Sequence, residues 1–138
     1  MFNFSKVQST LISMDYNWKD KVVLIVEDEE DNYELLCAIL EETNVKILKA
    51  HNGLEAIQLF NNNFQIDLIL MDIKMPEMDG FEATKEIRKT DKNIPIVAQT
   101  AYALSGDKER AIKAGCSSYI SKPIDSSRLF EIISEYFK

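Results

Sequence analysis

The chain has 138 residues, of which 46% are hydrophobic and 28% are charged. This length and balance are typical of one soluble domain that buries a sizeable core. The net charge of −7 argues against a general DNA-binding surface, because phosphate contacts need clustered lysine and arginine.

The first 20 residues contain no long apolar stretch and only Lys6 near their start, so they predict neither a secretion signal nor a membrane span. Phe4, Val7 and Leu11 would share one face of a helix. Residues 1–20 are therefore interpreted as an N-terminal extension, either a short docking helix or a mobile linker.

The first strand is predicted at residues 22–26, a continuous run of Val, Leu and Ile that is typical of a strand covered on both faces. Residues 30–43 follow, with leucine and isoleucine at helical spacing and acidic residues where the helix begins. Residues 45–50 are predicted to form a short second strand.

A second helix is predicted after Gly53, with Leu54, Ile57, Leu59 and Phe60 at helical spacing and its end in the polar run of residues 61–63. Residues 66–71 form the third predicted strand. The Asp79-Gly80 pair is typical of a turn, and it leads into a helix over residues 81–88.

The fourth strand is predicted at residues 94–99. A helix over residues 105–114 is expected to open with a serine cap at its first residue and to close at Gly115. Residues 118–121 predict a short fifth strand, and residues 126–136 a final helix.

Five strand-then-helix units predict an α/β, doubly wound domain, because parallel strands need crossover connections and these place helices on both faces of the sheet. Ligands bind such sheets beyond the carboxyl ends of the strands. Polar residues stand at these ends: Glu27 and Asp28 after the first strand, Asp72 after the third, Thr100 after the fourth and Lys122 after the fifth.

The three acids would repel one another at one edge of the sheet. At roughly 6 Å and an effective dielectric near 20, each ionised pair costs about 3 kcal/mol. The site must therefore hold a cation, take up a proton or rely on Lys122. Oxygen ligands without Cys or His suit Mg²⁺. With the metal present, Asp72 is a plausible nucleophile toward a phosphoryl group, whose oxygens Lys122 and the Thr100 hydroxyl would contact.

Four segments carry a resemblance to a known family: VLIVEDEEDN, LILMDIKMPEMDGFEATKEIR, IPIVAQTAYA and AGCSSYISKPI. In this order and spacing the chain resembles the receiver domains of two-component response regulators, most closely those of hybrid histidine kinases. The resemblance implies a receiver domain over residues 21–138. It also implies a flavodoxin-like (βα)5 fold, a five-stranded parallel sheet with strand order 2-1-3-4-5.

The resemblance also implies a role for each site residue. Asp72 would be the phosphoacceptor, and the Mg²⁺ ligands would be Glu27, Asp28, Asp72 and the backbone carbonyl of Lys74. Glu27 stands where the family more often has Asp, and its longer side chain is expected to reach the metal through water. The phosphate-sensing residues would be Thr100 and Lys122, and Lys122–Pro123 would be a cis peptide.

Tyr119 matches the aromatic switch of the family, whose ring turns into the space that Thr100 vacates on phosphorylation. The surface formed by the helix 105–114, the strand 118–121 and the helix 126–136 would then change and bind a downstream protein. The phosphoryl donor would be a histidine kinase or a histidine phosphotransfer protein, with no direct nucleic-acid partner and no membrane insertion.

The cellular context is predicted more coarsely. Cys37 and Cys116 have no metal-site spacing, and we interpret both as reduced residues of a cytoplasmic protein. The chain ends just after the last predicted helix, so it is expected to act as a stand-alone shuttle or to be part of a hybrid kinase.

Two other functions compete with this interpretation. A Mg²⁺-dependent phosphohydrolase similar to the haloacid dehalogenase family would need a second acid two residues after Asp72, where this chain has Lys74. A receiver-like module that no longer takes phosphate would serve only as a binding surface. The signalling domain is not expected to be an enzyme beyond its own phosphoryl transfer and slow dephosphorylation.

Overall fold

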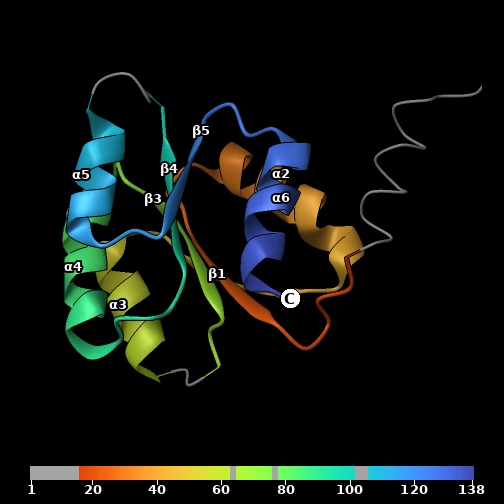
Figure 1. Cartoon of the computed structure of the whole chain (residues 1–138), viewed down its shortest axis with the longest axis horizontal. Helices are drawn as coiled ribbons and strands as arrows, with labels where there is room; N and C mark the ends of the chain where they lie inside the picture. The colour runs from red at the N-terminus through yellow and green to blue at the C-terminus, as the bar shows by residue number, and fades with distance from the viewer. Residues whose placement is uncertain (1–15, 63–64, 76–77, 102–105) are drawn as a thin grey trace, which may run out of the picture.

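A computed structural model describes residues 16–62, 65–75, 78–101 and 106–138. Within them, five parallel strands form one sheet in the order β2-β1-β3-β4-β5, as predicted (Figure 1). The strands are β1 (Val22–Val26), β2 (Lys46–Ala50), β3 (Leu68–Asp72), β4 (Ile96–Thr100) and β5 (Ser118–Ser121). The helices are α2 (Glu30–Leu40), α3 (Gly53–Asn62), α4 (Gly80–Thr90), α5 (Asp107–Ala114) and α6 (Ser126–Tyr136).

The helices cover the sheet on both faces (Figure 1). One core cluster joins alternate strand residues to α3, α4 and α5, and we call this face the α5 side. A second cluster joins the intervening strand residues to α2 and α6, and we call this face the α2 side. The alternation follows from the two-residue period of a strand, which sends successive side chains to opposite faces.

The three central strands carry the apolar runs that the sequence predicted. All five residues of β3 and of β4 are buried, whereas the edge strand β2 is largely half-buried. The pairing register places Met71 beside Val26 and Asp72 beside Gln99. The ends of β1, β3 and β4 therefore lie together at the carboxyl edge of the sheet.

Among the helix boundaries that differ from the prediction, two follow from the conformation of a residue next to the helix. The helix predicted over residues 30–43 ends at Leu40, and a 3-10 turn (Glu41–Thr43) completes it before Asn44 takes a left-handed conformation with φ 64°. Helix α5 begins at Asp107 rather than at residue 105, with the left-handed Gly106 at its N-cap position and no side-chain cap. The predicted serine cap, Ser105, lies outside the described residues.

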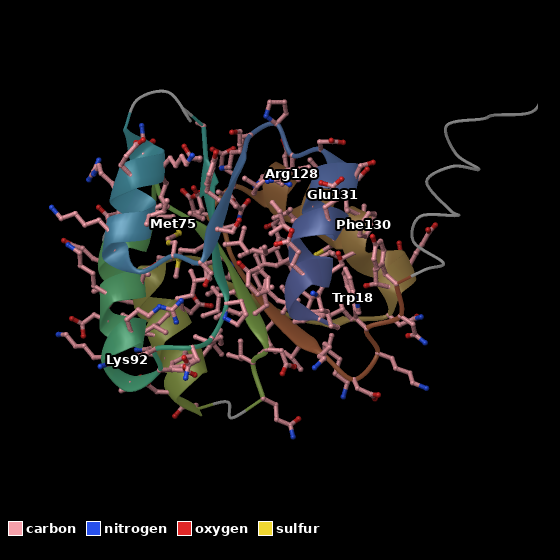
Figure 2. The ribbon with its side chains drawn as sticks, in the orientation of Figure 1. Trp18, Met75, Lys92, Arg128, Phe130 and Glu131 are labelled. Carbon is pink, nitrogen blue, oxygen red and sulfur yellow. The ribbon has the colours of Figure 1, made fainter. Side chains whose placement is uncertain are left out.

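The segment before β1 packs against the domain. Trp18 is buried in the cluster on the α2 side, and its backbone N–H donates to the carbonyl of Thr43 at 2.7 Å. Its ring lies 6.2 Å from that of Phe130 (Figure 2). It also meets the Phe137 ring edge-on at 5.4 Å, and the Tyr16 ring stacks on Phe130 at 5.5 Å. Part of the segment that was interpreted as an extension thus contributes to the core, while residues 1–15 lie outside the described residues.

None of the described helices combines the length and the apolar character that crossing a bilayer would require.

Candidate functional site

Three carboxylates meet at the carboxyl edge of the sheet, as the order of the strands requires. Glu27 and Asp28 directly follow β1, and Asp72 ends the neighbouring strand β3. One ligand oxygen from each residue lies within 4.8 Å of the others. Glu27 and Asp72 are buried and Asp28 is exposed, so the cluster opens to solvent on one side. An all-oxygen set of this kind fits a hard cation such as Mg²⁺.

Lys122 supplies the positive charge next to this cluster. Its Nζ lies 3.5 Å from Asp72 Oδ2 and 3.6 Å from Glu27 Oε2. Its backbone N–H donates to the carbonyl of Thr100 at 2.7 Å, and its peptide bond to Pro123 is cis. The lysine thus bridges two buried acids that would otherwise repel each other.

The Asp72 carboxyl has an unusual proton affinity. Burial in the first place, and the charge of Glu27 in the second, raise its pKa to a net value of about 7. Lys122 and the backbone N–H of Lys74, which donates to Asp72 Oδ1 at 3.2 Å, act in the opposite direction. The protein alone therefore does not fully stabilise an ionised Asp72, and a bound cation would.

The start of helix α4 lies tightly against the backbone of Asp72. Asp79 caps helix α4 by accepting the N–H of Glu82 at 2.9 Å. A Cβ at the next residue, Gly80, would lie 2.4 Å from the Asp72 carbonyl oxygen. The Asp-Gly pair that signalled a turn therefore also allows the backbone to approach the acid closely.

Thr100 lies at the end of β4 and points to the α5 side. Its Oγ1 donates to Asp107 Oδ2 at 3.3 Å, and both residues are almost fully buried. Nearby, the half-buried Tyr119 has the Lys108 ammonium group 5.0 Å from the centre of its ring. The structure thus gives the Thr100 hydroxyl a carboxylate partner on the first turn of α5.

Three polar residues at this edge were missed by the sequence analysis: Asn32, Gln99 and Asp107. Asn32 donates to Glu27 Oε2 at 2.8 Å and to Gln99 Oε1 at 3.1 Å, and Asp107 accepts from Thr100. Gln99 had a visible signal, because it is an amide in a strand that is otherwise apolar up to Thr100. Asn32 and Asp107 resemble ordinary surface positions of helices and carry no such signal.

The fold and the site together define a class of protein. A five-stranded doubly wound sheet carries an acidic cluster, a bridging lysine and a buried threonine at its carboxyl edge, where sheets of this kind bind their ligands. The family model of the response regulator receiver domain matches residues 23–134. The chain belongs to this family and is a receiver domain of two-component signalling.

Individual relatives agree with this assignment. The polar-differentiation response regulator DivK of Brucella anthropi is 44% identical over 118 residues, which cover 84% of this chain and 95% of DivK. DivK of Brucella ovis is 42% identical over the same shares of the two chains.

Solved structures share the fold. The receiver domain of the sensor histidine kinase PA1611 from Pseudomonas aeruginosa is 33% identical, with a TM-score of 0.78 over 84% of this chain and 96% of that one. That crystal structure has a magnesium ion coordinated in its active-site cleft. A chain of the Saccharomyces cerevisiae complex between the histidine phosphotransfer protein Ypd1 and the receiver domain of Ssk1 is also 33% identical, with a TM-score of 0.79 over 84% of this chain and 88% of that one.

Proposed function

We propose that Asp72 accepts a phosphoryl group from a phosphohistidine of a histidine kinase or a histidine phosphotransfer protein. The observation that carries the proposal is the position of its buried carboxylate, which lies 3.5 Å from the Lys122 ammonium and beside Glu27 and Asp28. The Ypd1–Ssk1 complex supports the class of donor, because it joins a similar receiver to a phosphotransfer protein.

The transfer is a single displacement at phosphorus. A carboxylate oxygen of Asp72 forms the new P–O bond, while the P–N bond to the donor histidine breaks and its electron pair returns to the imidazole. Lys122 would pair with a phosphoryl oxygen, and the Thr100 hydroxyl would donate to another. Such reactions depend mainly on positioning and on neutralising charge.

Magnesium would be held by the carboxylates of Glu27, Asp28 and Asp72 and by the backbone carbonyl of Lys74. When bound, it supplies positive charge that offsets the acids and the incoming phosphoryl oxygens. The magnesium ion in the similar receiver of PA1611 and the all-oxygen cluster of this chain support this choice of metal.

The output would be a change of a protein-binding surface. Thr100 would leave Asp107 to contact the phosphoryl group, and the Tyr119 ring would turn inward. The surface of α5, β5 and α6 would then bind a downstream protein. We place the protein in the cytoplasm, which agrees with the free thiols of Cys37 and Cys116.

Intact-mass measurement after incubation with acetyl phosphate and Mg²⁺ tests this proposal. We expect one added phosphoryl group that is released by hydroxylamine, as an acyl phosphate should be. Asp72→Asn should remove the label while leaving the circular dichroism spectrum unchanged, because only the nucleophile is lost. Labelling that persists in Asp72→Asn would refute the assignment of this residue.

The same assay separates the two competing functions. A binding module without phosphoacceptor activity would stay unlabelled at every Mg²⁺ concentration. A phosphohydrolase would turn over phosphate esters many times. The sequence argues against this function, because Lys74 stands where such an enzyme needs a second acid.

A further inference from the structure

Two side-chain amides, the half-buried Asn32 and the buried Gln99, lie next to the acidic cluster on the α2 side of the sheet. Asn32 of α2 donates from one Nδ2 group to Glu27 Oε2 at 2.8 Å and to Gln99 Oε1 at 3.1 Å. The other Glu27 oxygen, Oε1, accepts the backbone N–H of Glu29 at 3.3 Å. Both oxygens of the Glu27 carboxylate therefore accept hydrogen bonds. One of the two donors, Asn32, also donates to Gln99 of β4.

The orientation of the two amides follows from the carboxylate. An ionised carboxylate only accepts hydrogen bonds, so Asn32 must turn its NH2 group toward Glu27. The same NH2 group faces Gln99, which must therefore present its oxygen. This leaves Gln99 Nε2 buried and without a hydrogen-bond partner among the described residues.

Gln99 is not explained by stability. A buried donor without a partner costs free energy, whereas an apolar side chain of similar size would not. The position is fully buried at the end of a strand whose other residues on the α2 side are apolar. Among the described residues, the Gln99 side chain makes one hydrogen bond, which it accepts from Asn32, so its function should be sought in this contact.

We propose that Asn32 and Gln99 are positioning residues that fix the Glu27 carboxylate for magnesium binding. Glutamate has one more rotatable bond than aspartate, and holding it in one rotamer costs conformational entropy. The amide pair restricts the carboxylate before the metal arrives, as hydrogen-bonding partners of metal ligands commonly do. The inference rests on the proposed function in one respect, namely that Mg²⁺ binds at this acidic cluster.

Magnesium titration of the full chain without any phosphoryl donor, followed by ¹H–¹⁵N NMR, tests the pair. Gln99→Leu should raise the dissociation constant for Mg²⁺ on the order of tenfold. Its thermal midpoint should be no lower than that of the unsubstituted chain, since the unpartnered Nε2 is removed. Gln58→Leu, the same change at an exposed position of α3, is the matched control. A Gln99→Leu protein with unchanged magnesium affinity would overturn the proposal.

A double variant tests whether the two amides act through one path. If Gln99 acts only by holding Asn32, Asn32→Ala should already lose the whole effect. The combination Asn32→Ala/Gln99→Leu should then bind Mg²⁺ no more weakly than Asn32→Ala alone. Losses that multiply in the double variant would show that Gln99 does not act through Asn32.

A readout without metal separates this inference from the proposed function. The side-chain NH2 protons of Asn32 should be shifted downfield and protected from exchange, and Gln99→Leu should reduce both effects. If no Mg²⁺ bound to the unsubstituted chain while this change occurred, the metal site would fail and the positioning of Glu27 would stand. If Gln99→Leu left the chemical shift and the exchange protection of the Asn32 NH2 protons unchanged, the positioning role itself would be refuted.

Discussion

The two sides of the sheet hold the candidate site in different ways. On the α2 side, the Glu27 carboxylate has donors on both oxygens, and these come from Asn32 and the backbone of Glu29. On the α5 side, the Thr100 hydroxyl donates to a single oxygen of Asp107 at 3.3 Å, next to the half-buried Tyr119. The first arrangement suits a fixed metal ligand, and the second suits a group that changes partner.

This difference matches what a switch requires. A phosphoryl group must bind where the ligands are already placed, because ordering them later would consume binding energy. The conformational response must come from contacts that can be exchanged at low cost. We therefore expect the α2 side to set magnesium affinity and the α5 side to set the response to phosphorylation.

Lys122 connects the two sides, so its removal should have the largest effect. Its ammonium contacts Glu27 and Asp72, while its backbone holds the carbonyl of Thr100. Lys122→Ala should slow labelling by acetyl phosphate on the order of 100-fold, because it removes a preorganised charge from the phosphoryl oxygens. Time-resolved intact-mass measurement gives the rate.

Two further observations make this test decisive. Lys113→Ala, an exposed lysine of α5, should label at the normal rate and serves as the control. Once phosphorylated, Lys122→Ala should show unchanged Tyr119 resonances, since phosphate and switch are uncoupled. Normal labelling, or a normal Tyr119 response, would contradict the bridging role.

The next largest effect should appear in the stability of the metal-free protein. The pKa of Asp72 is raised from 3.8 to about 7 by burial and by Glu27. A raised pKa means that ionisation destabilises the fold, so stability is lost as the pH rises between about 4 and 7. The shift corresponds to about 4 kcal/mol. Because Asp72→Asn also removes a charged partner of Lys122, it should abolish this loss and stabilise the metal-free protein at pH 8 by roughly half of that amount, with little change at pH 4. Urea unfolding at both pH values measures the difference, and equal effects at the two would contradict it.

The fold was largely predictable from the sequence because the apolar runs of the central strands are continuous. Their ends mark the carboxyl edge, and the acids and lysine at this edge could be recognised as one set. The order of the strands came from the family resemblance. The start of α5 was predicted two residues early, since Gly106, in a left-handed conformation, precedes the helix.

The partners within the site could not be predicted in the same way. Gln99 and Asn32 are 67 residues apart, and only the packing of α2 on the sheet brings them together. Asp107 looks like a favourable acid at a helix N-terminus, and nothing in its neighbours indicates that Thr100 lies against it. Contacts of this kind depend on side-chain direction and helix placement, which residue patterns do not specify.

On the α5 side, the hydrogen bond from Thr100 to Asp107 should restrain the switch. A hydroxyl has one proton to donate, so Asp107 competes with the phosphoryl group for it. Asp107→Ala should raise the labelling rate about fivefold, which corresponds to about 1 kcal/mol for one hydrogen bond. Asp107→Asn, which keeps an acceptor oxygen, should change the rate less. Glu109→Ala on the exposed face of α5 is the control, and a slower rate in a stably folded Asp107→Ala protein would contradict the restraint.

On the α2 side, the length of Glu27 gives the smallest and most specific test. Glu27→Asp restores the residue that is more common in the family, but its shorter side chain draws the carboxylate away from Asn32. In the unsubstituted chain, Asn32 Nδ2 lies 2.8 Å from Glu27 Oε2. We expect magnesium affinity to change by only about threefold, since a short side chain needs less restraint. Gln99→Leu should then have no further effect in the Glu27→Asp background, although it weakens binding in the unsubstituted chain. Equal losses in both backgrounds, measured by the same NMR titration, would mean that Gln99 supports the sheet edge in general and not the Glu27 carboxylate.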